Sequence, residues 1–568
     1  MNRRILPVAI VIPLAFCFQA AIADLHVWVT PNTRRTLRED PRPNDASNTA
    51  TVWAARNECR SFQILVRSDA PARTINIDPA DLFGPDGAAL RAADARLFRQ
   101  HQLHITAGTY RNTDFKPGWY PDALIPFSHP ITQKPLPPAR FTAVPFDLPA
   151  NETHGFWVDL AVPADARPGR YTGQYRITSD GNKLAKVSVV LTVWDFALPR
   201  ISTLQTAFGS PAGRMRSYYR KLATAGKEPE PADWPAVETQ CAQLLTEHRI
   251  NATPPSATLT PVAQPDGSFR IPADQVAALR QFVDIIQVNA IQVPHPNNAV
   301  KDPDAERAKL HAWLAAFDRA AAELNRSHIT FYTYLLDEPN DEKAYRYVQK
   351  WGKAIRQANS VVKVMVVEQT RTQDPAWGDL YGAVDIWCPL FCLFDPDDAA
   401  RRQALGETLW TYTALCQGKE KTPWWHTDYP LLNYRAPAWM AWRYRMRGLL
   451  YWGGLSYWDQ VADPWIEPNT YRPKGEGNLA FNGEGCIVYP ARPVGYDGIA
   501  PSLRLKALRD SIQDYEYLAI LERLGLAKEA DQIVLDLTPS FYRWNPDPAA
   551  YDSARAQLAA LILTAGRR

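Results

Sequence analysis

Several kinds of site have no counterpart in this sequence. No Gly-rich phosphate loop follows an apolar run, and neither an HExxH pair nor the Gly-x-Ser-x-Gly turn of a serine hydrolase occurs. The net charge is only +3 over 568 residues, with no basic run or tail. We therefore expect no cofactor and no nucleic-acid partner, and we do not expect binding to acidic membrane surfaces.

Cysteine is also sparse, and the cysteines are not spaced as in a disulfide framework. One of the seven cysteines, Cys17, lies in the first 23 residues, and the other six are scattered: Cys59, Cys241, Cys388, Cys392, Cys416 and Cys486. The CPLFC spacing lacks a second Cys/His pair, so we expect no metal site. Buried thiols, or one disulfide, remain the two interpretations.

Long charge-free apolar runs are absent except at the N-terminus. There, Arg3 and Arg4 precede an apolar stretch over residues 5–18 and an A-x-A site that ends at Ala23. This pattern predicts a signal peptide over 1–23, cleaved after Ala23. We expect an exported protein, periplasmic or secreted, with no stable membrane span.

Proline and tryptophan are abundant instead, with 48 and 19 residues. Residues 24–200 contain short apolar runs with period-two alternation and frequent turn residues, which predicts an N-terminal antiparallel β-sandwich. Residues 201–500 alternate helical stretches with short apolar runs, which favours a (β/α)8 TIM-type barrel as catalytic domain. Residues 501–568 predict C-terminal helices packed on the barrel, and we interpret the charges of SLRLKALRDSIQDYEYL as structural ion pairs.

The stretch FYTYLLDEPN places two adjacent carboxylates, Asp337 and Glu338, where a buried strand should end. Catalytic groups of such barrels lie at the C-terminal ends of strands. Pro339 should hold Glu338 extended, with the pair at the rim. Alternatively, Asp337 or Asn340 caps the next helix. We expect Tyr334, further back in the strand, to pack inside the barrel.

Two carboxylates at a barrel mouth indicate glycoside hydrolysis. In the usual schemes the two acids flank the scissile bond from different strands. A consecutive pair suits a substrate-assisted variant, in which the 2-acetamido group of the sugar attacks the anomeric carbon. Glu338 would then be the acid/base, and Asp337 would orient the acetamido group.

The sequence resembles glycoside hydrolase family 123, formerly a family of unknown function. The resemblance rests on PGRYTGQYRI…LTVWDFALP, YTYLLDEP, GGLSYWDQVADPW, GEGCIVYP and PSLRLKALRDSIQDYEYL, which span most of the chain. It implies a sandwich plus (β/α)8 barrel and a retaining β-N-acetylgalactosaminidase. The family's Asp-Glu pair corresponds to Asp337 and Glu338.

Aromatic and polar residues on other predicted strand ends are candidates for sugar binding, because aromatic rings stack on the apolar face of a pyranose. The candidates are Trp424, Trp425, His426, Asp428, Tyr429, Trp452, Tyr457, Trp458 and Asp459. Core packing is the alternative for each tryptophan. In WWHTDYP, His426 and Asp428 stand where the family pattern usually has a tyrosine and a cysteine. These two residues either alter the sugar contacts or form a structural hydrogen bond.

The sequence thus predicts an exported exo-β-N-acetylgalactosaminidase with an oxazolinium intermediate. Its substrate would be an oligosaccharide or glycoconjugate with terminal β-linked GalNAc. Two alternatives remain: a glycosidase acting on a sugar without an acetamido group, and a non-catalytic carbohydrate-binding or surface protein that keeps the fold.

Overall fold

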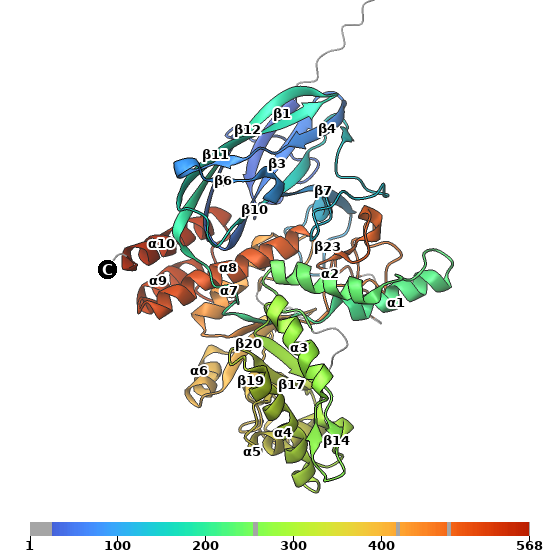
Figure 1. Cartoon of the computed structure of the whole chain (residues 1–568), viewed down its shortest axis with the longest axis vertical. Coiled ribbons are helices and arrows are strands. Elements are labelled where there is room, and N and C mark those ends of the chain that lie inside the picture. The colour runs from blue at the N-terminus through green and yellow to red at the C-terminus, as the bar shows by residue number, and fades with distance from the viewer. Residues whose placement is uncertain (1–24, 254–258, 416–420, 474–476, 478, 567–568) are drawn as a thin grey trace, which may run out of the picture.

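The structure is a computed structural model that describes residues 25–253, 259–415, 421–473, 477 and 479–566. The predicted signal peptide and Cys416 lie outside the described residues. Figure 1 shows a strand-rich unit at one end, the parallel strands with their helices at the other, and helices of the C-terminal region between them.

The N-terminal unit is a sandwich of two sheets, and the residues between them are apolar and buried, among them Ile64, Phe156, Ile177 and Val189. One sheet has the order β1 (Leu25–Pro31), β3 (Glu58–Ser68), β10 (His154–Val162), β7 (Arg96–Ile105), β8 (Gly118–Pro126). The other has the order β2 (Thr49–Arg56), β12 (Asn182–Ala197), β11 (Gly169–Ser179), β4 (Ala72–Asp78), β9 (Phe146–Leu148); in addition, β5 (Leu82–Phe83) pairs with β11, and β6 (Ala89–Leu90) pairs with β5. The expectation of a purely antiparallel sandwich is corrected at one pair, because β2 and β12 run parallel.

The second unit is a nearly closed parallel sheet of seven paired strands. Their order is β13 (Gln205–Ala207), β21 (Gly448–Tyr451), β20 (Thr408–Thr413), β19 (Ile386–Trp387), β18 (Lys363–Val367), β17 (Thr330–Asp337), β16 (Ala290–Val293). Between β13 and β16, the Asn251 amide donates to Thr206 O at 2.9 Å and to Asn289 Oδ1 at 2.8 Å. Side-chain hydrogen bonds of Asn251 therefore bridge the position at which an eighth strand of a barrel would pair.

Helices follow most of these strands: α1 (Pro211–Thr224), α2 (Trp234–Glu247), α3 (Ala273–Ile285), α4 (Arg307–Leu324), α5 (Glu342–Gln357), α6 (Pro396–Ala404), α7 (Leu432–Arg443) and α8 (Leu503–Arg523). Between β18 and β19, where every residue is described, the only helix is the single 3-10 turn η4 (Pro375–Trp377). The architecture is thus barrel-like rather than eight regular β/α units. Two short hairpins complete it, β14 (Val262–Ala263) with β15 (Phe269–Arg270) and β22 (Tyr489–Pro490) with β23 (Ile499–Ala500).

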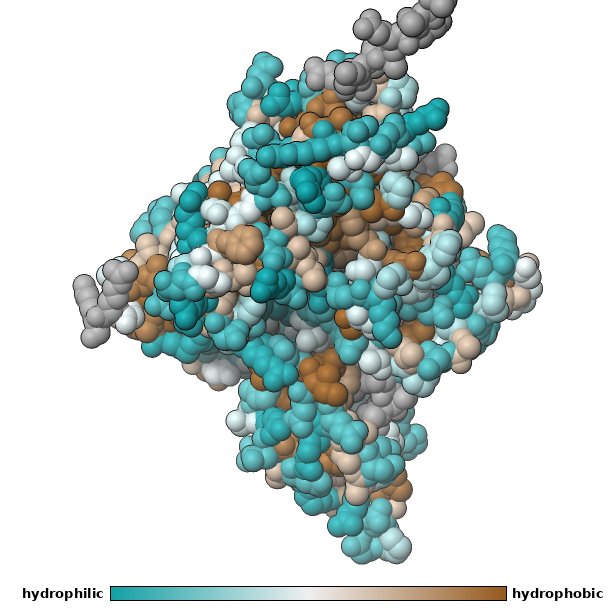
Figure 2. Space-filling view, turned by 45° about the horizontal axis from the view of Figure 1, so that its top comes forward, coloured by the Kyte–Doolittle hydropathy of each residue, from teal (hydrophilic) through white to brown (hydrophobic). Residues whose placement is uncertain are grey.

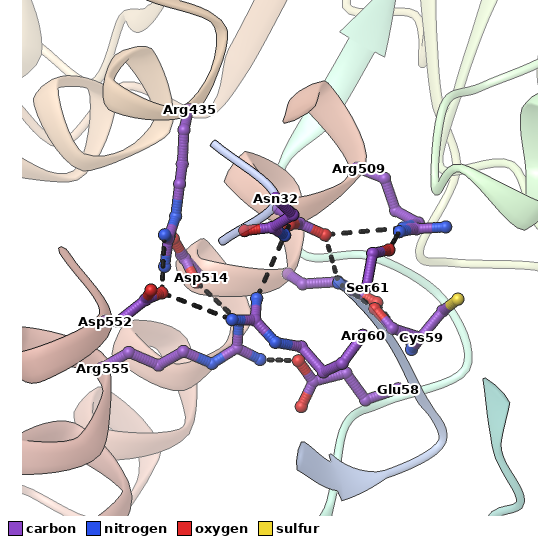
Figure 3. A network of polar contacts seen from close by, with 12 residues as sticks. Asn32, Glu58, Cys59, Arg60, Ser61, Arg435, Arg509, Asp514, Asp552 and Arg555 are labelled. Atoms are coloured by element: carbon purple, nitrogen blue, oxygen red, sulfur yellow. Dashed lines mark hydrogen bonds and ion pairs between the residues drawn. The ribbon is translucent and has the colours of Figure 1, made fainter. Parts of the chain in front are cut away.

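Helix α8 joins the two units, and its charges are buried. Arg504, Lys506, Arg509, Asp510, Asp514 and Glu516 are each at most 2% exposed. The Lys506 ammonium lies 2.7 Å from Asp159 of the sandwich, and Asp514 accepts a 2.7 Å hydrogen bond from Arg435 Nε of α7. Figure 3 shows the neighbouring part of this network, in which residues of β3 and of α10 (Pro548–Ala565) lie beside those of α7 and α8. The helix is ion-paired as expected, and its ion pairs lie in a buried interface between the two units.

Hydrophilic residues cover most of the face drawn in Figure 2, and apolar residues appear there in small separate groups. Within the described residues, no helix has the length and apolarity that a membrane crossing requires. After α8 the chain ends in α9 (Ala527–Leu537) and α10, which pack against it.

Candidate active site

The end of β17 explains how two consecutive carboxylates reach one cavity. Neighbouring side chains of a regular strand point to opposite faces. Here the register with β18 shifts between Tyr334 and Leu336, and Glu338 adopts a left-handed backbone with φ of +42°. The Glu338 N–H still donates to Val367 O at 3.1 Å. The expectation of an extended Glu338 is therefore wrong, because a bulge and a strained residue turn the pair inward, as is common at functional sites.

Both carboxylates line a cavity of about 620 Å³ at the C-terminal ends of the parallel strands. Its wall comes from many strands and the segments that follow them: Thr206, Ala207, Phe208, Gly209, Arg214, Asn251, Ala252, Thr253, Ala290, Ile291, Gln292, Tyr332, Tyr334, Asp337, Glu338, Tyr412, Ala414, Leu415, Leu450, Tyr451, Trp452 and Tyr471. A cavity of this size and mixed lining is typical of a small-molecule site.

Each carboxylate accepts a hydrogen bond from a tyrosine. Tyr334 Oη donates to Asp337 Oδ1 at 2.6 Å, and Tyr412 Oη of β20 donates to Glu338 Oε1. Burial, followed by the neighbouring carboxylates, raises the pKa of both phenols, so both remain neutral donors. Tyr334 is thus part of the site, whereas the sequence analysis placed it in barrel packing.

The helix-cap alternative for the pair is excluded, because the N-cap of α5 is Asp341. Its side chain accepts from Ala344 N at 2.7 Å. Asp337 and Glu338 are exposed to the cavity, and neither forms an ion pair with a described residue. Their charge is therefore balanced only by phenol dipoles, which leaves both oxygens able to meet a substrate.

A third carboxylate, Glu368, lies just beyond the end of β18 and is 6% exposed. Burial raises its pKa to about 7, and Gln373 Nε2 and Gln369 N each donate to it at 3.0 Å. The nearby charge of Glu338 also raises this pKa. Ionisation of Glu368 near neutral pH therefore adds negative charge beside Glu338.

Of the predicted sugar-binding residues, Trp452 lines the cavity, and Tyr457 and Asp459 lie beside it. The Tyr457 ring is 5.4 Å from the Trp452 ring. Arg214, a lining residue, stacks over Tyr457 at 4.3 Å and lies 3.6 Å from Asp459. The structure therefore brings these three near the carboxylates, although only Trp452 is in the wall.

The other three predicted tryptophans, Trp424, Trp425 and Trp458, are fully buried. Their indole N–H groups donate to backbone oxygens: Trp424 to Ala414, Trp425 to Asn433 at 2.9 Å, and Trp458 to Val488 at 3.0 Å. None of the three lines the cavity. These rings leave no face open to a sugar and support the loops behind the wall.

The other three predicted residues, His426, Asp428 and Tyr429, lie in two different parts of the structure. His426 is fully buried, with Nε2 2.8 Å from Glu484 Oε2. Glu484 in turn accepts from Trp452 Nε1, so His426 is one residue removed from the wall. Asp428 and Tyr429 line a different cavity, on the side of the sandwich. The two departures from the family pattern, His426 and Asp428, are therefore both structural contacts here.

Sequence reasoning missed several wall residues. Tyr412 is the second-last residue of the run LWTYT, and Gln292 lies in the short strand β16. The available signal was a polar side chain near the C-terminal end of a predicted strand, the same signal that identified Asp337. As for metals, no group of three His, Cys, Asp or Glu in the described part of the chain is placed to hold an ion.

The comparisons with known proteins agree with this architecture. Models of the glycoside hydrolase 123 catalytic domain and N-terminal domain match residues 293–521 and 28–179. A family 123 glycoside hydrolase from Clostridium perfringens, described for glycolipid glycan hydrolysis, superposes with a TM-score of 0.63 at 14% identity, covering 96% of this chain and 98% of that one.

A family 39 glycoside hydrolase from Bacteroides cellulosilyticus gives a TM-score of only 0.31 at 9% identity, covering 84% of this chain and 83% of its own. No curated protein matches. The two domain models follow one another along the chain and match parts of both structural units, and the C. perfringens enzyme shares the fold over nearly the whole length. The chain belongs to glycoside hydrolase family 123 and is a glycoside hydrolase.

Proposed function

We propose that the protein is an exported exo-β-N-acetylgalactosaminidase that works with retention and substrate assistance. The observation that carries the proposal is the consecutive pair Asp337 and Glu338 in one cavity, each held by a neutral phenol and neither ion-paired within the described residues. A pair from one strand end lies on one side of a bound sugar. This placement fits a reaction in which the nucleophile comes from the substrate itself.

In the first step Asp337 accepts a hydrogen bond from the acetamido N–H of the sugar. This contact turns the acetamido oxygen toward the anomeric carbon and stabilises the positive charge that develops on the amide. Tyr334 holds one Asp337 oxygen, so the other is free to meet the N–H. The acetamido oxygen attacks the anomeric carbon, and the bond to the leaving oxygen breaks.

Glu338 supplies the proton to that leaving oxygen as general acid. In the second step the Glu338 carboxylate takes a proton from water, which attacks the anomeric carbon and opens the oxazolinium ring. The two inversions give net retention. Tyr412 fixes the orientation of the carboxyl group through both steps.

The wall favours a sugar as the ligand. Trp452, Tyr412 and Tyr471 provide aromatic surface, and Gln292 and Arg214 provide donors for hydroxyl groups. The C. perfringens relative is described for glycolipid glycan hydrolysis, and we extend the proposal to a glycoconjugate with terminal β-linked GalNAc. The leader pattern supports action in the periplasm or outside the cell.

The test compares aryl β-GalNAc, β-GlcNAc and β-galactoside substrates with the purified mature chain. We expect turnover of the acetamido sugars, with GalNAc preferred, and tight competitive inhibition by a GalNAc-thiazoline that mimics the oxazolinium ion. Turnover of the galactoside alone contradicts substrate assistance and indicates a glycosidase for a sugar without the amide. Binding of GalNAc without turnover of any substrate indicates a carbohydrate-binding protein.

A further inference from the structure

The second half of the WWHTDYP loop belongs to a second cavity. Asp428 and Tyr429 line a space of about 710 Å³ that is larger than the catalytic cavity. Its wall combines segments from three parts of the chain: residues 33–40 and 111–120 of the sandwich unit, residues 421–433 before and within α7, and residues 542–548 before α10. The catalytic proposal uses none of these residues.

Two buried polar side chains in this wall have donors without acceptors. The Arg35 side chain is 7% exposed; Nη1 donates to Pro121 O, but Nε and Nη2 meet no acceptor among the described residues. Thr33 is 3% exposed, and its hydroxyl also has no partner in the described part of the chain. Buried donors without acceptors cost free energy, and an anionic ligand in this cavity would supply the acceptors that the described residues do not.

The charge around Arg35 is also unbalanced. Asp122 is the carboxylate nearest to it, with Oδ1 3.6 Å from Arg35 Nη1. The same carboxylate forms a closer pair with Arg504, at 2.9 Å, and accepts from Tyr489 Oη at 2.6 Å. One carboxylate thus serves two buried guanidinium groups. Burial lowers the pKa of Arg35, as expected for a cation with incomplete compensation.

The rim adds further positive charge, from Arg34, Arg111, Lys116, Lys421 and Arg543. Three carboxylates also line the cavity, but each already accepts hydrogen bonds. Asp40 accepts from Leu37 N at 2.8 Å and Asp114 from Lys421 at 2.9 Å. Asp428 accepts from Thr109 N at 2.7 Å, from Thr109 Oγ1 at 2.6 Å and from Asn112 at 3.0 Å. With Arg35 the wall holds six cationic side chains against these three carboxylates, and this excess of positive charge favours an anionic ligand.

Aromatic rings supply the other half of the recognition surface: Tyr120, Tyr429, Tyr542 and Trp544 line the same cavity. Aromatic faces beside guanidinium and hydroxyl donors suit a pyranose ring that bears an acidic group. Arg binds both carboxylate and sulfate oxygens through its planar set of N–H groups.

We propose that this cavity is a second carbohydrate-binding site, for a sugar carrying a carboxylate or sulfate group, with Arg35 and Thr33 as the anion donors. The two cavities are lined by segments close in the sequence: Ala414 and Leu415 line the catalytic cavity, and residues 421–422 and 428–433 line the second. Trp424 Nε1 donates to Ala414 O and so links these two segments. The site rests on its own residues and does not depend on the sugar proposed for the catalytic cavity.

The test is calorimetric titration of the full mature chain, with the GalNAc-thiazoline present in excess to occupy the catalytic cavity. Three disaccharides serve as probes: glucuronate-β1,3-GalNAc, its 6-sulfated form, and neutral N-acetyllactosamine. We expect the acidic probes to bind at least about tenfold more tightly than the neutral one, and less tightly as salt is raised. The two acidic probes show whether the carboxylate suffices or the sulfate is required.

Arg35→Met should weaken acidic binding by about tenfold or more, the loss of a charge-assisted hydrogen bond. Because Arg35 is buried, Thr33→Val and Trp544→Ala provide tests that keep the buried charges intact, with about three- to tenfold weakening expected for each. Arg167→Met, which removes an arginine exposed on the sandwich, is the matched control and should bind as wild type. Equal binding of neutral and acidic probes, unchanged binding by all three variants, or no acidic binding at about 10 mM would overturn the proposal.

Discussion

The catalytic cavity and the α8 interface both concentrate carboxylates, but they stabilise them in opposite ways. In the interface, Asp159 lies 2.7 Å from Lys506 and 3.1 Å from Arg509, and Asp514 lies within 3.0 Å of Arg435 and Arg555. In the cavity, each of the two acids instead accepts a hydrogen bond from a tyrosine hydroxyl, Asp337 from Tyr334 and Glu338 from Tyr412.

This difference separates structural acids from reactive ones. A carboxylate enclosed by guanidinium groups has its lone pairs occupied and its charge compensated. A carboxylate that accepts one phenol and faces a cavity keeps an oxygen available for a substrate. The acids of α8 should therefore matter for folding, and those of β17 for turnover.

Glu338→Gln should give the largest effect on rate. The amide cannot donate the proton to the leaving group, so we expect kcat on a GalNAc disaccharide to fall about a thousandfold. An aryl substrate with a good leaving group should lose less, because it needs less protonation. Glu342→Gln, an exposed acid in the first turn of α5, is the control and should retain wild-type turnover; an unimpaired Glu338→Gln removes this residue from the mechanism.

Arg435→Met should give the next largest effect, on the free energy of unfolding rather than on the rate. The variant removes a buried partner of Asp514 and Asp552. Removal of one member of a buried ion pair costs about 3–5 kcal/mol. Urea unfolding measures the loss, with Arg167→Met as the exposed control. The kcat of the folded fraction should stay within about threefold of wild type; a large loss of kcat at unchanged stability would contradict the distinction between the two regions.

Tyr412→Phe tests the phenol partner of Glu338. Removal of a hydrogen bond to a charged group costs about 1.5–3 kcal/mol, so we expect kcat/KM to fall by about tenfold or more with little change in unfolding free energy. Tyr444→Phe removes a hydroxyl with a 3.4 Å contact to Pro539 O, far from the cavity in the fold, and should have no effect on turnover. If both variants behave alike, Tyr412 does not orient the acid.

Glu368 gives the smallest predicted effect, and it depends on pH. Its folded-state pKa of about 7 lies above the usual 4.5, so the folded state holds a proton between those values that the unfolded state has lost. The free energy of unfolding should therefore fall as pH rises through this window, by about 2–3 kcal/mol between pH 5 and pH 8 from this residue. Glu368→Gln should lack that fall, and the wild-type-minus-variant difference from urea unfolding at pH 5 and pH 8 measures it. A difference that does not change with pH contradicts the assignment.

The sequence was informative where local pattern and position in the fold coincide. The apolar run that stops at Asp337 identified both the strand and the acids, because a buried parallel strand ends at the active face. Trp425 and Trp458 show the limit, since a tryptophan near a strand end can pack inward as well as outward, and only tertiary contacts decide which. The charges of α8 were predicted to form ion pairs, but their burial depends on partners such as Asp159, more than 300 residues earlier in the chain.

Local sequence rules also could not predict the bulge at Tyr334 or the left-handed backbone of Glu338. Pro339 favours an extended residue before it, yet pairing with β18 and the geometry of the strand end override that preference. The same holds for the connection between β18 and β19, where alternation predicted a helix and the chain forms only η4.

The most direct test of the central claim is the dependence of rate on the nucleophilicity of the substrate amide. Aryl β-glycosides of GalNAc whose N-acetyl group carries none, one, two or three fluorines differ chiefly in that property. If Asp337 supports attack by the amide oxygen, kcat/KM should fall steeply with each fluorine, and Asp337→Asn should be slow across the series. A rate that is flat across the series in the wild-type enzyme would contradict substrate assistance.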